Sequence, residues 1–124
     1  MSLYDVSSRD MTDAARDPVS FLPLTPALFH VLLSLADGDK HGYAILKEVD
    51  ARTGGEVVLS TGTLYGIVKR LLADGLIRES AAGSDDRRTA YRLTAFGRKV
   101  AQAEAERLRS LVAAAGKLLR EPAV

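Results

Sequence analysis

Residues 59–72 contain the side chains with the clearest capacity for chemistry. If this stretch is a helix with about 100° between successive residues, two cations, a phenol, a threonine hydroxyl and two glycines share one arc. Cations and hydrogen-bonding groups on a helix can contact phosphates and base edges in a nucleic-acid groove, and glycines let another surface approach closely. An ordinary solvated helix face is the alternative, so the neighbouring elements must decide. The arc consists of Gly62, Thr63, Tyr65, Gly66, Lys69 and Arg70.

Catalytic chemistry has little support in this sequence. There is no cysteine, which excludes thiolate nucleophiles, disulfides and zinc fingers. The two histidines, His30 and His41, are far apart in sequence, and His30 lies in an apolar segment where a packing role is expected. Asp85 and Asp86 lie in a predicted loop, which is a poor scaffold for acid–base catalysis. We therefore expect neither an enzyme nor a metal site, and no cofactor.

Charge and hydropathy restrict the partners and the compartment. The formal net charge of the 124 residues is only +1, so binding to nucleic acid must depend on local clusters of cations. The longest apolar run is too short to span a bilayer, and the acidic N-terminal stretch does not resemble a signal peptide. We expect a cytoplasmic protein with no membrane partner.

Two helices are predicted before the polar arc. Thr25 and Pro26 open an apolar helix that runs to about Ala36, and a second helix extends from residue 41 or 42 to Arg52. Ser60 then caps the helix that carries the polar arc. The opposite face of that helix is apolar and should pack in the core, through Leu64, Ile67, Val68 and Leu71. Two short helices with a tight connection predict a helix-turn-helix, whose second helix enters the major groove.

A β-hairpin is predicted after these helices. Residues 76–80 and 89–93 have strand character, and the small, acidic and glycine residues between them favour a loop. An isolated hairpin is not stable, so it should pack on the helices as a wing. Arg87 and Arg88 lie where the loop returns, and their guanidinium groups can reach phosphates or a minor groove. Pairing of these arginines with Asp85 and Asp86 is the alternative.

The chain therefore divides into three predicted parts, which form a mainly α fold with a small β-hairpin, an α+β winged helix-turn-helix. Residues 1–23 form an N-terminal arm, residues 24–93 form the winged domain, and residues 94–120 form one long helix. The long helix carries an apolar stripe that needs a partner, either the same helix of a second subunit or the arm folded back onto it. The residues assigned to dimerisation are Val100, Leu108, Leu111, Val112, Ala115, Leu118 and Leu119.

A set of short motifs resembles the PadR family of bacterial transcriptional regulators. In chain order, the motifs are His41-Gly42-Tyr43 with Ile45, Leu59-Ser60-x-Gly62-Thr63-Leu64-Tyr65, Lys69-Arg70-Leu71, Gly75-Leu76-Ile77, Arg87-Arg88, and Tyr91-Arg92-Leu93-Thr94 with Gly97. The resemblance covers residues 25–97. It implies a homodimeric repressor that binds a pseudo-palindromic operator in double-stranded DNA, and a small hydrophobic or aromatic effector near the dimer interface.

The resemblance also assigns DNA-binding roles to particular residues. Those assigned to the recognition helix and its cap are Ser60, Thr61, Thr63, Tyr65, Lys69 and Arg70; Lys40 and Tyr43 are assigned to the preceding helix start, and Arg87 and Arg88 to the wing. Three positions depart from the family pattern: Thr61 replaces a frequent proline, Gly66 a larger side chain, and Ala90 a frequent aromatic. Gly66 and the low net charge keep open a second hypothesis, a winged helix that binds protein without reading DNA.

Overall fold

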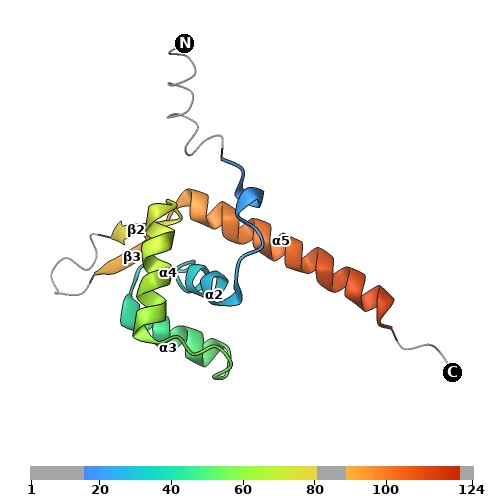
Figure 1. The fold of residues 1–124 in the computed structure, drawn as a ribbon, viewed down its shortest axis with the longest axis horizontal. Helices are drawn as coiled ribbons and strands as arrows, with labels where there is room; N and C mark the ends of the chain where they lie inside the picture. The colour runs from blue at the N-terminus through green and yellow to red at the C-terminus, as the bar shows by residue number, and fades with distance from the viewer. Residues whose placement is uncertain (1–15, 81–88, 121–124) are drawn as a thin grey trace, which may run out of the picture.

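Four α-helices, one short 3-10 helix and three strands make up the part of the chain that the computed structural model describes, residues 16–80 and 89–120. This arrangement confirms the predicted α+β winged-helix fold (Figure 1). In chain order, the elements are η1 (Pro18–Phe21), α2 (Pro26–Ser34), β1 (Lys40–His41), α3 (Gly42–Arg52), α4 (Thr61–Ala73), β2 (Ile77–Ser80), β3 (Ala90–Leu93) and α5 (Ala95–Leu118).

Hydroxyl side chains fix where three of the helices begin. Thr25 accepts the backbone N–H of Leu28 at 3.2 Å, and Ser60 accepts that of Thr63 at 3.0 Å. Thr94 caps α5 in the same way, accepting the N–H of Gly97 at 2.9 Å. Each cap satisfies one amide that the helix itself leaves without an acceptor, a contribution of about 1 kcal/mol.

The core lies where α2, α3, α4 and the first half of α5 meet the sheet. The predicted inner face of α4 is confirmed, with Leu64, Val68 and Leu71 buried and Ile67 packed against them. This face leaves the polar arc of α4 on the outside. The other buried apolar residues are Val31, Leu32, Leu35, Ile45, Val49, Leu76, Ile77, Ala90, Tyr91, Phe96, Val100 and Ala101.

The wing is part of a three-stranded antiparallel sheet with the order β1-β3-β2. The sequence predicted β2 and β3 but not β1, whose two residues pair with Tyr91 and Ala90. Asp39, just before β1, accepts two hydrogen bonds from the Arg92 guanidinium, at 3.0 and 2.9 Å, and one from the Ser80 hydroxyl. This carboxylate therefore fastens the turn before α3 to both strands of the wing.

Asp39 should make the stability of the protein depend on pH in the acid range. The hydrogen bonds from Arg92 and then from Ser80 lower its pKa from 3.8 to about 2. Because the pKa is lower in the folded state, the stabilisation is present above about pH 4 and is lost as the pH falls towards 2. Urea unfolding should show that Asp39→Asn is less stable than the wild type at pH 7 and that the difference shrinks between pH 4 and pH 2. A parallel pH dependence for both proteins would contradict this role, and Asp50→Asn, a change to an exposed carboxylate, is the control.

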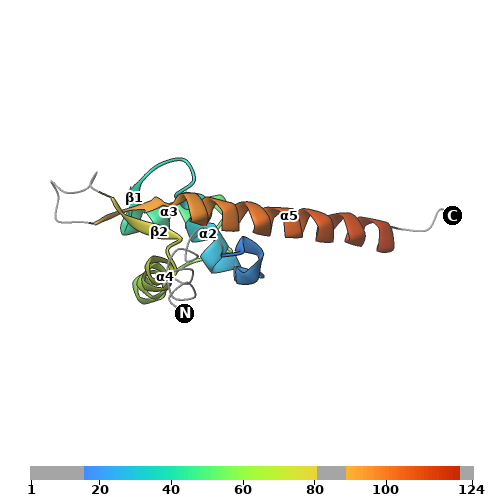
Figure 2. The ribbon, with the colours of Figure 1, turned by 90° about the horizontal axis from the view of Figure 1, so that it is seen from above.

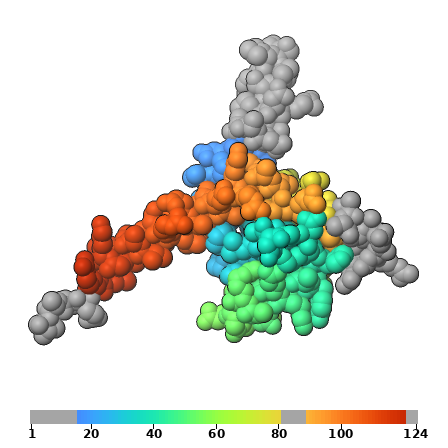
Figure 3. Space-filling view, turned by 180° about the vertical axis from the view of Figure 1, so that it is seen from behind, coloured from blue at the N-terminus to red at the C-terminus, as the bar shows by residue number. Residues whose placement is uncertain are grey.

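Helix α5 has two halves with different surroundings. Phe96, Gly97, Val100, Ala101 and Glu104 are buried, so the first half belongs to the core of the winged domain, although the sequence placed a boundary before residue 94. The second half stands away from the body (Figures 1 and 2). Figure 3 shows the same projection from behind. Val100 is fully buried in its own domain, so its assignment to a dimer surface was wrong.

The described part of the N-terminal arm packs against the first half of α5. The Phe21 and Phe96 rings meet edge to face with their centroids 5.6 Å apart, so Phe21 anchors the arm to the domain. The carboxylate of Glu104, itself buried, accepts the backbone N–H of Leu24 and two hydrogen bonds from Arg107, both at 2.8 Å. The bonds from Arg107 are the largest cause of the lowered pKa of Glu104. The arm from Arg16 onwards thus covers the near half of α5 and leaves the leucines of the far half exposed.

Candidate nucleic-acid interface

The outer face of α4 is polar, cationic and open. All six residues of the predicted arc are exposed, and α4 contains no acidic residue. A Cβ added at Gly62 or Gly66 would meet no atom within 4 Å, so the surface is open at both positions. Arg70 is mostly exposed and lies 3.8 Å from Asp74, a separation that leaves its guanidinium available to another partner. The exposed residues of the arc are Gly62, Thr63, Tyr65, Gly66, Lys69 and Arg70, next to exposed Ser60 and Thr61.

Tyr65 links the recognition helix to the beginning of α3. A Cβ on Gly42 would lie 2.3 Å from the Tyr65 hydroxyl oxygen, so the glycine makes room for the tyrosine. Tyr65 is still 45% exposed. His41 is the residue before α3, and its side chain makes no hydrogen bond that caps the helix. The first-turn amides of α3, which lie near the Tyr65 hydroxyl, are therefore not capped by His41. Helix N-termini of this kind bind phosphate oxygens.

Tyr43 and Lys47 lie together on the exposed surface of α3. Tyr43 is 60% exposed, as expected for a residue assigned to the DNA backbone, and the Lys47 ammonium lies 5.6 Å from the centre of its ring. We did not predict a role for Lys47 from the sequence. Its position one turn after Tyr43 on a helix was the available signal, because residues three and four apart share a face.

Lys40 is occupied within its own chain. Its ammonium donates to the Ser34 carbonyl and to Asp37, both at 2.5 Å, and lies 3.4 Å from Glu48. Burial opposes its charge, but these acidic partners outweigh burial and raise its pKa. Lys40 therefore stabilises the turn between α2 and α3, and we leave it out of the proposed DNA surface.

The strands of the wing contribute cations that the sequence analysis did not assign. Arg78 and Arg92 are direct partners in the β2–β3 pair, and both are exposed. Arg92 is held by Asp39, whereas Arg78 is an exposed cation on β2. The position of Arg78 next to an apolar residue in a predicted strand was the available signal, since neighbouring residues of a strand face opposite sides. The predicted wing contacts Arg87 and Arg88 lie outside the described residues.

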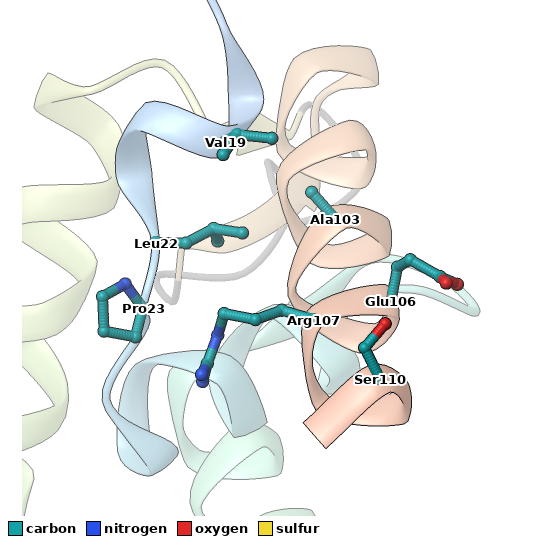
Figure 4. A pocket seen from close by; sticks show the side chains of 7 residues that line it. All are labelled: Val19, Leu22, Pro23, Ala103, Glu106, Arg107 and Ser110. Carbon is teal, nitrogen blue, oxygen red and sulfur yellow. The ribbon is translucent and has the colours of Figure 1, made fainter. Parts of the chain in front are cut away.

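The apolar stripe of α5 borders two hollows beside the arm. In the first, of about 390 Å³, Val19, Leu22 and Pro23 of the arm face Ala103, Glu106, Arg107 and Ser110 of α5 (Figure 4). The second, of about 420 Å³, lies between α2 and α5 and ends at Leu108. Beyond Leu108 the stripe is uncovered: Leu111 is 56% exposed, Val112 69%, Leu118 83% and Leu119 77%, while Ala115 is half-buried.

The two histidines lie apart, His30 in α2 and His41 at the end of β1. His30 is part of an exposed network in which its Nδ1 lies 3.2 Å from the Arg52 guanidinium. Partial burial, and then the charge of Arg52, lower its pKa. Within residues 16–80 and 89–120, no three histidine, aspartate or glutamate side chains are grouped as metal ligands would be. Nor does this part of the chain contain a helix long and apolar enough to cross a bilayer.

The arrangement of α3, α4 and the wing, with the polar face of α4 exposed, is that of a winged helix-turn-helix protein. Residues 31–103 match the family model of the transcriptional regulator PadR-like family. The chain belongs to this family, which confirms the resemblance and a role in transcription rather than catalysis.

Two solved structures of transcriptional regulators and one curated protein are similar to this chain. A transcriptional regulator from Clostridium thermocellum is 29% identical with a TM-score of 0.65, over 75% of this chain and 92% of that one. A PadR family transcriptional regulator from Eggerthella lenta is 26% identical with a TM-score of 0.62, over 98% of this chain and 100% of that one. An uncharacterized 37.1 kDa protein in transposon TN4556 of Streptomyces fradiae is 37% identical over 81 residues. Those residues are 65% of this chain and only 22% of that protein.

Proposed function

We propose that this protein is a homodimeric repressor that binds a pseudo-palindromic operator, with α4 in the major groove and the wing at the adjacent minor groove. The carrying observation is the exposed face of α4, where Lys69 and Arg70 lie beside two threonines and Tyr65 without an acidic neighbour in the helix. Thr61, Thr63, Tyr65, Lys69 and Arg70 contact DNA from this helix. Tyr43 and the first turn of α3 contact the phosphate backbone.

The second subunit binds through the far half of α5. Four large apolar side chains there are exposed, which is unusual for a monomeric protein in water. A two-fold pairing of the same stripe covers all of them with one self-complementary contact. The dimer surface comprises Leu108, Leu111, Val112, Ala115, Leu118 and Leu119.

The hollow between α2 and α5, lined by Leu24, Phe29 and Leu33 among others, is large enough for a small aromatic effector next to this surface. As a regulator of transcription, the dimer acts in the cytoplasm.

The DNA contacts are tested with duplexes from the region upstream of the gene. We expect Lys69→Ala with Arg70→Ala to weaken binding by about 10- to 100-fold at low salt, because two phosphate or base contacts are lost. If both side chains bind phosphates, the log–log salt slope should become shallower by about 0.9 for each. Fluorescence anisotropy at several salt concentrations measures both quantities.

Lys99→Ala with Arg109→Ala is the matched control, because it removes one lysine and one arginine that are exposed on α5. This variant should bind the duplex as the wild type does. Equal affinities and equal salt slopes for all three proteins would refute the assignment of α4. A wild-type protein that binds none of the duplexes would instead support the alternative, a winged helix that binds another protein.

A further inference from the structure

The C-terminal end of α4 is where three separate segments of the chain meet. The helix ends in a Schellman motif: Gly75 has a φ of +76°, the Leu76 N–H donates to the Leu71 carbonyl, and the Gly75 N–H donates to the Leu72 carbonyl. In this motif the carbonyl of Asp74 is left without a partner inside the helix. The Arg16 guanidinium, from the N-terminal arm, donates a hydrogen bond to it at 2.8 Å.

The same guanidinium contacts the beginning of α5. Its central carbon lies 4.2 Å from the centre of the Phe96 ring and 5.5 Å from that of Phe21, so the cation is stacked on the pair of rings that anchors the arm. A Cβ on Gly75 would lie 3.2 Å from the Arg16 side chain, which shows how closely it follows the end of α4. Arg16 thus touches α4, α5 and η1 at once.

This contact matters because the chain path from α4 to α5 is indirect. The two helices are connected through β2, the wing and β3, and Thr94 supplies a direct link by donating to the Gly75 carbonyl at 2.7 Å. Arg16 adds a second link between the two helices, and it comes from the N-terminal arm. A cation at a helix C-terminus is also favoured by the helix dipole. The arm therefore helps to fix the orientation of α4 relative to α5.

We propose that Arg16 is a positioning residue, which fixes the angle between α4 and α5 and makes the N-terminal arm part of the DNA-reading machinery. This inference rests on the proposed function, in which α5 forms the dimer and two copies of α4 must lie about 34 Å apart on DNA. A small change in the angle between α4 and α5 moves both recognition helices away from this spacing. Arg16 precedes the residues that match the family model, which start at residue 31.

The angle can be measured without DNA. The chain has no cysteine, so Gly66→Cys in α4 and Lys99→Cys in α5 can carry two spin labels at exposed positions. With labelled chains diluted in unlabelled protein, the distance distribution reports one α4–α5 pair. We expect Arg16→Ala to broaden or shift this distribution. Arg98→Ala is the matched control, because Arg98 of α5 also donates to a helix-end carbonyl, that of Ala36 at 2.8 Å, but at the end of α2.

DNA binding provides the second measurement, made with proteins that lack the labels. We expect Arg16→Ala to lower the affinity for a full operator by up to about tenfold, because one charge-assisted hydrogen bond no longer holds α4 and α5 in the orientation that fits the operator. The affinity for a single half-site and the dimer mass should change little, whereas general destabilisation would affect full and half-sites alike. Arg16→Lys retains the charge without the planar fork and should give a smaller effect in the same direction; it replaces Arg16→Ala if that variant does not fold.

The two proposals fail in different ways. An unchanged distance distribution in Arg16→Ala, with wild-type affinity for the full operator, would overturn the positioning role while the protein remained a DNA-binding regulator. If the wild type binds no duplex but Arg16→Ala still changes the distance distribution, the proposed function is refuted. The role of Arg16 in fixing the angle between α4 and α5 then stands. An equal loss of affinity for full and half-sites would also overturn the positioning role, because spacing would then not be involved.

Discussion

Replacing Leu111 and Leu118 with glutamate is expected to convert the protein to a monomer that binds its operator at least about 100-fold more weakly. Both leucines are exposed in the single chain, at 56% and 83%, so the variant should fold with little loss of stability. In the proposed dimer both would be covered, and burying four carboxylates without partners is strongly unfavourable. A monomer holds one half-site and loses the gain in affinity that two linked sites provide. Sedimentation velocity measures the mass, and anisotropy with full and half-sites measures the binding.

The position of the charge on α5 is tested by a variant with the same change in net charge. Ala113→Glu with Lys117→Gln also lowers the charge of each chain by two, but both residues are exposed on the opposite side of the helix. This control should remain a dimer with wild-type affinity for the operator. Glutamates at 111 and 118 that left the mass at that of a dimer would contradict the proposed interface.

Local signals in the sequence were sufficient to place the helices and the two faces of α4. Thr25 was predicted to open its helix and Ser60 to cap the next, and each accepts the amide hydrogen bond that defines a cap. The periodicity of α4 separated its buried face from its polar arc because both faces depend on spacing along one helix. Signals of this kind need no knowledge of which segments meet in space.

Contacts between distant segments were not predicted from the sequence. Strand β1 has only two residues, too few to show an alternating pattern, and it exists because β3, some fifty positions later, pairs with it. The same holds for contacts within a folded turn: the family resemblance assigned Lys40 to DNA, but the fold brings Asp37 and Glu48 within reach of its ammonium. Whether a surface cation is free depends on its neighbours in the folded chain.

The two halves of α5 show the same limit. Val100 and Leu111 both fit an apolar helical stripe, yet one is fully buried in the domain and the other is exposed. Glu104 reads as a solvated residue in the sequence, but it is 2% exposed and holds the arm through Leu24. The periodicity of a helix indicates which face is apolar but not where along the helix the domain ends. That point is set by the size of the body against which α5 packs.

Gly97→Ala is expected to lower the free energy of unfolding by about 3 kcal/mol or more, a large fraction of the 5–15 kcal/mol that is typical of a folded domain. A Cβ at this buried position would lie 2.0 Å from the Leu76 carbonyl oxygen and 2.8 Å from its carbonyl carbon. These are backbone atoms in the connection between α4 and β2, and the oxygen already accepts a hydrogen bond from the Thr94 N–H at 3.0 Å. Neither side can move without breaking the cap of α5, so the clash must separate α5 from the end of α4.

Urea unfolding at one fixed protein concentration measures this loss, since dimerisation makes stability depend on concentration. Gly66→Ala is the control: it is also a glycine inside a helix, but its added Cβ would meet no atom within 4 Å. That substitution should be neutral or should stabilise the protein by up to about 1 kcal/mol, because alanine is the better helix former. If Gly97→Ala behaved like Gly66→Ala, then α5 would not need the close approach to Leu76. The link between α4 and α5 would then have to rest on Thr94 and Arg16 alone.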